Sequence, residues 1–268
     1  MAAPRDVTGI ASPWPDLDRA TTGIHPGEMW IVAGRPSSGK SVLGLQWAAH
    51  AAAAGRAVLF ASVEMSAEMC RQRLVACEAR VPLRWVRTGR TPHGEDLAAL
   101  VERVVGLTRT HRASLLDLRP MAGATPADVR AAALADRAAW GRLDLVVVDY
   151  VQLLAAPRSM PNREQETAAK SAALKALAGE LGCGVLALAQ LNREVERTSR
   201  RPRMSDLRES GALEQDADLV ALVHRPGGKE SPAMEVCIDK QRNGEPGIVH
   251  LHLDGARVRA ESVERGAR

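Results

Sequence analysis

The sequence is poor in aromatic residues. One tyrosine, one phenylalanine and five tryptophans are spread over 268 residues, so aromatics make up 3% of the chain. Proteins that grip single-stranded nucleic acid by stacking bases on aromatic rings need more rings than this. The scarcity argues against base stacking, and any contact with nucleic acid is expected to run through the phosphate backbone.

Lysine is also scarce. Only five of the 36 basic residues are lysine and the rest are arginine, whose guanidinium suits bidentate recognition of phosphate or carboxylate. The 32 acidic residues leave a formal net charge of +4. This mild basicity permits contact with nucleic acid but does not require it.

The four cysteines, Cys70, Cys77, Cys183 and Cys237, form no C-x-x-C pair. Their spacing excludes a zinc ribbon or a dithiol redox motif, and we expect reduced, mostly buried thiols. Cys70 and Cys77 are seven residues apart in a predicted helix, which places them on one face.

Long hydrophobic runs are missing as well. No apolar segment follows the N-terminal residues, and Asp144 and Asp149 interrupt the longest apolar stretch, residues 143–156. A signal peptide and a membrane-spanning helix are therefore not expected. The sequence predicts a cytoplasmic protein with no membrane partner, folded as a single domain over residues 1–268 with a core from about 8 to 260.

Short apolar runs alternate with longer alanine-rich amphipathic stretches, which is typical of buried parallel strands joined by helices. The runs are residues 29–33, 57–63, 114–118, 143–149, 184–189 and 219–224. Two further strands, 234–240 and 248–253, surround an Asn243-Gly244 turn and predict a C-terminal β-hairpin. The fold class is α/β, with a mostly parallel central sheet and helices on both faces.

Helix signals agree with this order. Thr125, Pro126 and Asp128 form a capping-box start with proline at the first helical position. Residues 164–181 predict a helix that ends at Gly182.

A phosphate-binding motif follows the first predicted strand. The pattern G-x-x-x-x-G-K-S leads directly into a helical stretch, so backbone N–H groups and the helix N-terminus point at a phosphate. Lys40 is expected to reach the β- and γ-phosphates, and the Ser41 hydroxyl to bind Mg²⁺. The expected nucleotide-contacting residues of this P-loop (Walker A motif) are Gly34, Arg35, Pro36, Ser37, Ser38, Gly39, Lys40, Ser41 and Val42.

Polar residues end three other predicted strands at the edge where parallel α/β sheets bind ligands. Asp149 is expected to hold Mg²⁺, as the Walker B carboxylate does. Glu64 is placed to polarise an attacking water, although a solvated residue ahead of a helix cap at Ser66 also fits its position. Gln190 is a neutral hydrogen-bonding group suited to sensing the γ-phosphate.

Taken together, these motifs resemble those of the C-terminal ATPase domain of the DnaB replicative helicases, a RecA-type fold. The resemblance covers about Thr8 to Ala260. Its segments are residues 33–41 (AGRPSSGKS), 64–67 (EMSA), 148–153 (VDYVQL), 188–193 (LAQLNR), 205–218 (SDLRESGALEQDAD) and 240–244 (KQRNG).

The resemblance implies an ATP- and Mg²⁺-dependent motor with a RecA-like P-loop NTPase fold. Glu64 resembles the family's catalytic glutamate, and Gln190 its γ-phosphate sensor. Arg73 matches an arginine near the nucleotide. Arg242 matches an arginine finger that reaches into the neighbouring subunit's site, with Lys240 beside it; taken alone, Arg242 is equally a solvated arginine at a hairpin tip.

The same resemblance implies contact with single-stranded DNA. Arg208, Glu209 and Gly211 match a loop that follows the DNA backbone in the family's central channel, with translocation of the 5′–3′ type. The run Arg200–Arg203 either adds to that positive surface or is a solvated loop. The implied partners are single-stranded DNA, further copies of the chain in a hexamer, and other replication proteins.

Two departures from the family keep other functions open. The P-loop begins at Gly34, so the family's N-terminal helical domain and linker helix are expected to be absent, and Ala172 replaces a usual arginine. The chain then assembles through its ATPase faces, borrows a scaffold, or has given up processive unwinding. The alternatives are a RadA- or RecA-like recombination ATPase and a nucleotide-gated accessory module that does not unwind DNA by itself.

Overall fold

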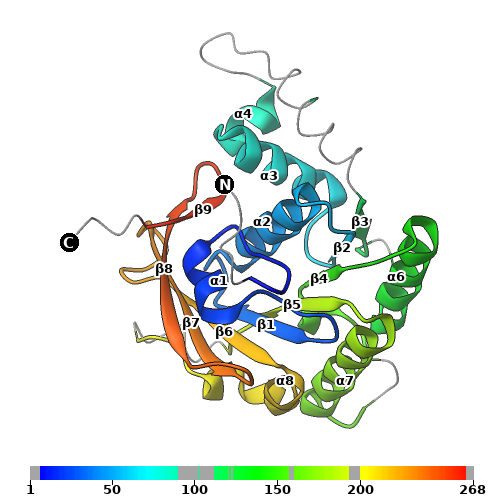
Figure 1. Cartoon of the computed structure of the whole chain (residues 1–268). Coiled ribbons are helices and arrows are strands. Elements are labelled where there is room, and N and C mark those ends of the chain that lie inside the picture. The colour runs from blue at the N-terminus through cyan, green and yellow to red at the C-terminus, as the bar shows by residue number, and fades with distance from the viewer. Residues whose placement is uncertain are drawn as a thin grey trace.

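The computed structural model describes residues 7–89, 102, 112–119, 121, 123–156, 160–192 and 200–263. Its strands are β1 (Met29–Gly34), β2 (Val58–Ser62), β3 (Ala113–Asp117), β4 (Leu145–Asp149), β5 (Gly184–Gln190), β6 (Leu219–His224), β7 (Ala233–Gln241), β8 (Gly247–Asp254) and β9 (Arg259–Ser262). These strands form one sheet in the order β3-β2-β4-β5-β1-β6-β7-β8-β9 (Figure 1). All eight predicted strands are present, within one or two residues of their expected ends.

The sheet is parallel from β3 to β6 and antiparallel from β6 to β9. This confirms the predicted mostly parallel α/β fold and its C-terminal hairpin. The hairpin connection, residues 242–246, is longer than a two-residue Asn-Gly turn. The hairpin also continues into β9, a four-residue strand that the sequence analysis did not predict.

Helices cover both faces of the sheet. They are α1 (Pro15–Thr21), α2 (Lys40–Ala53), α3 (Ala67–Ala79), α4 (Leu83–Thr88), α6 (Pro126–Trp140), α7 (Arg163–Leu181) and α8 (Gly211–Asp216), with 3₁₀ turns η1 (Val151–Leu153) and η3 (Met204–Ser210). In Figure 1, α6, α7 and α8 lie together on one side of the sheet and α2 and α3 on the other. Two buried apolar clusters, one on each face, fill the space between sheet and helices.

Successive side chains of β1 point to opposite faces of the sheet, and both faces are covered, which explains why its apolar run is continuous. Met29, Ile31 and Ala33 join the cluster that includes α6, α7 and α8, whereas Trp30 and Val32 join the cluster of α1 and α2. Every residue of the strand is buried. Because successive strand side chains point to opposite faces, a strand covered on both sides must be apolar throughout.

Two helix ends follow the predicted signals. At the start of α6 the Thr125 N–H donates to the Asp128 carboxylate at 2.7 Å, and Pro126 is the first helical residue. Helix α7 ends at Leu181, directly before Gly182. The local sequence therefore sets where these two helices begin and end.

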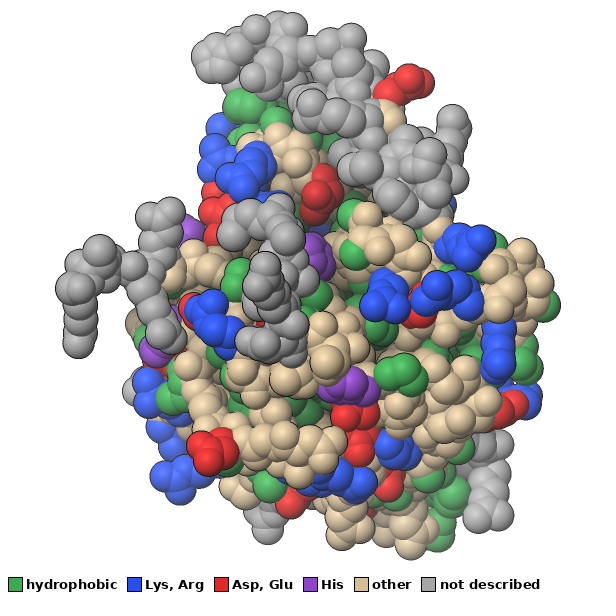
Figure 2. Space-filling model, viewed as in Figure 1, with side chains coloured by type: hydrophobic (Ala, Val, Ile, Leu, Met, Phe, Trp, Pro, Cys, Tyr) green, Lys and Arg blue, Asp and Glu red, His purple; other side chains and the backbone are tan. Residues whose placement is uncertain are grey.

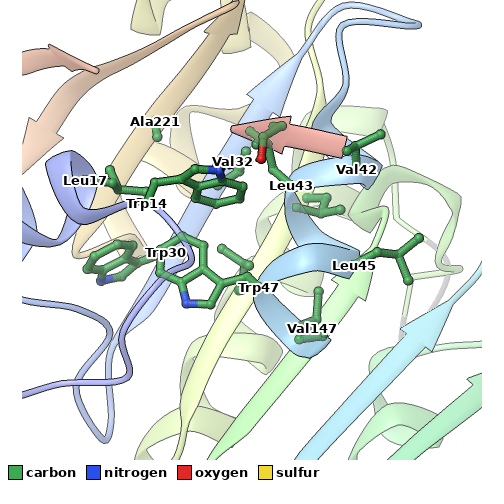
Figure 3. Packing of buried hydrophobic residues seen from close by; sticks show 14 of the residues in the cluster. Trp14, Leu17, Trp30, Val32, Val42, Leu43, Leu45, Trp47, Val147 and Ala221 are labelled. Atoms are coloured by element: carbon green, nitrogen blue, oxygen red, sulfur yellow. Dashed lines mark hydrogen bonds between the residues drawn. The ribbon is translucent and has the colours of Figure 1, made fainter. Parts of the chain in front are cut away.

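Three tryptophans join the first strand, the first two helices and the last strand. The Trp47 ring lies edge-on to Trp14 at 6.0 Å and to Trp30 at 5.6 Å between centroids (Figure 3). The Trp14 indole Nε1–H donates to the Ala260 carbonyl of β9 at 3.0 Å. Such edge-to-face contacts add to the burial of large apolar rings.

All four cysteines are free and buried, as expected. Cys70 and Cys77 share the inner face of α3. Burial raises the pKa of the Cys70 thiol to about 11 and that of Cys77 to about 12. Such thiols stay protonated and unreactive at neutral pH.

Each helix in the described part of the chain is too short or too polar to span a membrane.

Replacing Trp47 with alanine tests this aromatic cluster. Trp47 is 1% exposed, so Trp47→Ala leaves a cavity and should lower the free energy of unfolding by about 3–5 kcal/mol. Urea unfolding followed by circular dichroism measures the loss. Met69→Ala is the control, because Met69 is 45% exposed and should change stability by less than about 0.5 kcal/mol. Equal stability in the two variants would show that the cluster does not hold these elements together.

Candidate nucleotide-binding site

The carboxyl ends of four parallel strands meet at one edge of the sheet. Gly34 at the end of β1 pairs with Gln190 at the end of β5. Ser62 at the end of β2 pairs with Asp149 at the end of β4. The P-loop, Gln190 and Asp149 therefore come together at this carboxyl edge, where parallel α/β sheets bind their ligands.

The P-loop turns tightly between Gly34 and Lys40. A Cβ on Gly34 would collide with the Ser38 hydroxyl, and one on Gly39 would lie 2.5 Å from the Met234 methyl carbon. Gly39 also has a backbone φ of 101°, a value that residues other than glycine rarely adopt. Gly34 is thus held in a tight space beside Ser38, whereas Gly39 is required by its conformation, since the flexible Met234 side chain can move.

Helix α2 begins at Lys40 with no side chain capping its N-terminus. The first N–H groups of a helix lack partners within the helix, and they attract anions together with the helix dipole. An uncapped start directly after a tight glycine turn fits a phosphate group. The Val42 side chain packs in the apolar core, so only its backbone is available to a ligand.

Lys40 is a buried cation whose ammonium makes no salt bridge with the described residues. Its side chain is 6% exposed, and its Nζ lies 4.9 Å from the centre of the Tyr150 ring. A buried ammonium needs an anionic partner to repay its lost hydration. The ring contact supplies part of that need, and a bound phosphate would supply the rest.

Asp149 is a buried carboxylate that, like the Lys40 ammonium, lacks a partner for its charge among the described residues. It is fully buried, and neither of its carboxylate oxygens accepts a hydrogen bond of good geometry from the part of the chain that the structure describes. Burial raises its pKa to about 6; the neighbouring Ser41 hydroxyl and Lys40 oppose this shift and Glu64 adds to it. An unpartnered carboxylate beside a serine hydroxyl is the oxygen donor set that Mg²⁺ prefers, so these residues fit the expected metal.

Glu64 and Arg73 lie near Asp149. The Val63 N–H donates to the Asp149 carbonyl at 2.7 Å and that of Glu64 at 3.4 Å. The Glu64 side chain is exposed, and the charges of Glu64 and Arg73 both act on the Asp149 pKa. Ser66 caps α3 by accepting from the Met69 N–H, so Glu64 both precedes a helix cap and faces the site.

Two residues that follow Asp149 also belong to this region, although the sequence pattern assigned no role to either. Tyr150 supplies the ring beside Lys40. The Gln152 side-chain amide makes two hydrogen bonds to the backbone of Gln190. Both residues lie in the segment 148–153, which resembles the family. Their spacing does not indicate which neighbouring element their side chains contact.

Lys240 and Arg242 lie at the opposite edge of the sheet. The Arg242 N–H donates to the Asp218 carbonyl at 2.9 Å, and the Asp218 carboxylate accepts from the N–H of Met29, the first residue of β1. The six residues of β1 separate this edge from the P-loop by roughly 17 Å. Neither basic residue reaches the P-loop of its own subunit.

The Arg242 side chain is half-exposed and anchored at its base. Its Nη1 lies 3.3 Å from an Asp218 carboxylate oxygen and its Nη2 donates to the Gln215 carbonyl at 2.8 Å. The Lys240 ammonium donates to the Glu214 carbonyl at 2.5 Å, and partial burial lowers its pKa. Both residues thus hold the last carbonyls of α8.

The predicted DNA-contacting residues belong to η3 and α8. Gly211 is the first residue of α8, and the side chains of Arg208 and Glu209 lie outside the described residues. In the basic run, Arg200 pairs with Asp206 at 2.7 Å and Arg201 with Glu235 at 2.6 Å. On the described part of the face in Figure 2, basic side chains are scattered among acidic ones.

Comparison with known proteins identifies the family. The model of the DnaB-like helicase C-terminal domain matches residues 9–262. The chain belongs to this family, and its fold is that of a RecA-like P-loop ATPase domain.

Individual relatives agree. The chain is 39% identical to the replicative DNA helicase DnaB of Haemophilus influenzae, over 96% of this chain and 56% of the relative. It is also 39% identical to that of Geobacillus stearothermophilus, over 92% of this chain and 55% of the relative. The chain thus spans a little over half the length of the curated relatives it matches.

Two solved structures are similar throughout the chain. One is an ATPase domain that superposes with a TM-score of 0.89 at 29% identity, covering 97% of this chain and 93% of that domain. The other is a DnaB-like replicative helicase, solved to describe its interactions with primase. It superposes with a TM-score of 0.89 at 28% identity, covering 97% of this chain and 63% of that helicase.

Substituting Asp149 tests the fit to a metal. Because its pKa lies above the ordinary 3.8, this carboxyl favours the fold only when protonated, and that contribution is lost as the pH rises from about 4 through about 6. At pH 7.5 without metal, Asp149→Asn should therefore stabilise the protein by roughly 1–3 kcal/mol. Thermal unfolding with and without Mg²⁺ and ADP measures this.

In the same experiment Mg²⁺ should add stability to the ADP-bound wild type and none to ADP-bound Asp149→Asn. Arg130→Ala, which removes an exposed partner of Glu180, serves as the control and should respond to Mg²⁺ like the wild type. A destabilised Asp149→Asn protein that still responds to Mg²⁺ would contradict this assignment.

Proposed function

We propose that this chain is an ATP-hydrolysing motor of the replicative-helicase type, which moves on single-stranded DNA and completes its active sites between subunits. One observation carries the proposal. The residues suited to bind and cleave ATP gather at one edge of the sheet, and the two candidate trans-acting cations lie at the other. This separation supports a scheme in which one subunit would hold most of a site at one edge and would complete its neighbour's site from the other.

Binding of ATP starts from the P-loop backbone and the uncapped start of α2. These N–H groups would surround the β-phosphate, and the Lys40 ammonium would exchange its ring contact for the β- and γ-phosphates. Ser41 and Asp149 would hold Mg²⁺, which neutralises charge between the β- and γ-phosphates. Each buried charge of the site would gain a partner in the bound state.

Hydrolysis needs a water aligned with the γ-phosphorus. Glu64 would accept the proton of that water as its oxygen forms the new bond to phosphorus and the bond to the ADP oxygen breaks. The side chain of Glu64 is exposed, which suits a base that must meet water. Gln190 at the end of β5 would hydrogen-bond the γ-phosphate and register its loss.

Arg242 would supply positive charge to the γ-phosphate of the adjacent subunit. A cation added from a neighbour stabilises charge that develops in the transition state, and it makes hydrolysis depend on assembly. The half-exposed guanidinium at the far edge of the sheet is consistent with such a reach. Lys240 would act beside it.

Single-stranded DNA is the proposed track. Arg208, Glu209 and Gly211 would follow its phosphate backbone, a contact that is independent of sequence and weakened by salt. Membership of the family supports a ring of six copies around the strand and contacts with other replication proteins as part of this proposal. A similar helicase was solved for its interactions with primase, which supports a partner of that class.

Mixing two inactive variants tests whether Arg242 acts between subunits. Lys40→Ala should abolish hydrolysis because it removes the phosphate-binding cation. Arg242→Ala should abolish hydrolysis while ATP binding stays within about twofold, because the finger acts mainly in the transition state. In an equal mixture about a quarter of the interfaces carry both intact residues, so about a quarter of the wild-type rate should return.

The rate of ATP hydrolysis is measured for each variant and for the mixture. Arg130→Ala is the control for loss of an exposed arginine and should keep full activity. Full activity of Arg242→Ala, or an inactive mixture of subunits that assemble, would exclude a finger acting in trans.

A further inference from the structure

The side-chain amide of Gln152 pairs with the backbone of Gln190 in the way a neighbouring strand would. Its Oε1 accepts from the Gln190 N–H at 3.0 Å, and its Nε2 donates to the Gln190 carbonyl at 3.1 Å. A primary amide offers one acceptor and two donors in a plane, so it can imitate a peptide group. Gln152 lies in η1, which directly follows Asp149 and Tyr150.

This pair replaces a missing part of the sheet. Strand β4 pairs with β5 only as far as Val148 and Ala187, whereas β5 continues to Gln190. On its other side, Gln190 is the register partner of Gly34. The Gln152 amide therefore holds the end of β5 at the point where the strand reaches the nucleotide site.

The two residues after Gln190 contact two further parts of the molecule. The Leu191 N–H donates to the carbonyl of Gly34, the first glycine of the P-loop, at 3.2 Å. The Asn192 N–H donates to the carbonyl of Asp206 in η3 at 3.2 Å. Residues 190–192 thus connect the P-loop, the segment after Asp149 and the element that carries the candidate DNA-contacting residues.

We propose that Gln152 is a positioning residue for Gln190. By fixing the Gln190 peptide group, Gln152 aims the Gln190 side chain at the γ-phosphate and ties its position to the strand that carries Asp149. Loss of the γ-phosphate is then passed through Asn192 to η3. This inference rests on the proposed role of Gln190 as the γ-phosphate sensor.

A second amide in the same fold provides a matched control. The Gln46 Oε1 accepts from the Ala260 N–H at 2.6 Å, and its Nε2 donates to the Ala260 carbonyl at 3.1 Å. This pair joins α2 to β9 and is buried. Gln46 has the same chemistry with the backbone of Ala260 in β9, at the far end of the sheet order from β5, so Gln46→Met reports the loss of such a pair without disturbing Gln190.

The experiment compares Gln152→Met with Gln46→Met in the full chain. Calorimetric titration in Mg²⁺ measures the dissociation constants of ADP and of the β,γ-imido analogue of ATP. Gln152→Met should lower the preference for the analogue by about tenfold, with ADP affinity changed by less than about twofold. Gln46→Met should keep the wild-type preference while losing thermal stability.

Stimulation of ATP hydrolysis by single-stranded oligothymidine gives a second readout. We expect Gln152→Met to lose most of it and Gln46→Met to retain it. Gln152→Glu keeps the shape and the acceptor but loses the donor when ionised, so it should fall between wild type and Gln152→Met. If Gln152→Met does not fold, Gln152→Glu is the variant that tests the positioning role.

The positioning role would be overturned if both Gln152 variants kept the wild-type preference for the analogue over ADP and the wild-type stimulation of ATP hydrolysis by single-stranded DNA. A wild-type protein that does not distinguish the analogue from ADP would overturn the proposed function, and the inference with it. Failure of the positioning role and failure of the proposed function are distinguishable. Only failure of the proposed function would abolish the preference for the analogue in wild type and in Gln46→Met as well.

Discussion

Backbone hydrogen bonds between β1 and β5 hold the P-loop beside Gln190, and the candidate site is arranged around that pairing. Both strands are central in the sheet, and their apolar side chains are buried on both faces. With Gly34 and Gln190 fixed in register, the loop after Gly34 must rise over the carboxyl edge. The adjacent pair of β4 with β2 brings Asp149 and Glu64 to the same edge, since Glu64 follows β2 by two residues.

At this edge the chain carries charges that the fold itself does not satisfy. Within the described residues, Lys40 is buried without a salt bridge, and the buried Asp149 carboxylate accepts no hydrogen bond of good geometry. Each destabilises the protein alone, because a buried charge needs a partner. In the proposed function, a magnesium–nucleotide complex would offer an anion to Lys40 and a cation to Asp149, and unfavourable burial would become favourable binding.

Much of this arrangement could be predicted from the sequence, because buried parallel strands leave continuous apolar runs and the P-loop has strict spacing. Strand β9 could not, since Arg259–Ser262 is short and mixes polar with apolar residues. The pairing of Arg201 with Glu235 joins residues 34 apart and depends on where β7 lies in the sheet. The amide pair of Gln152 likewise depends on where β4 stops, which its sequence does not mark.

The distance of Arg242 from the P-loop could not be predicted from the order of the motifs either, because it depends on the length of β1 and on the antiparallel direction of β7. In the proposed function, that distance would make ATP hydrolysis depend on assembly. The rate of ATP hydrolysis per subunit against protein concentration, with and without single-stranded DNA, tests this most directly. The account predicts a rate that rises with concentration and rises further with DNA. A flat, low rate indifferent to DNA would contradict it.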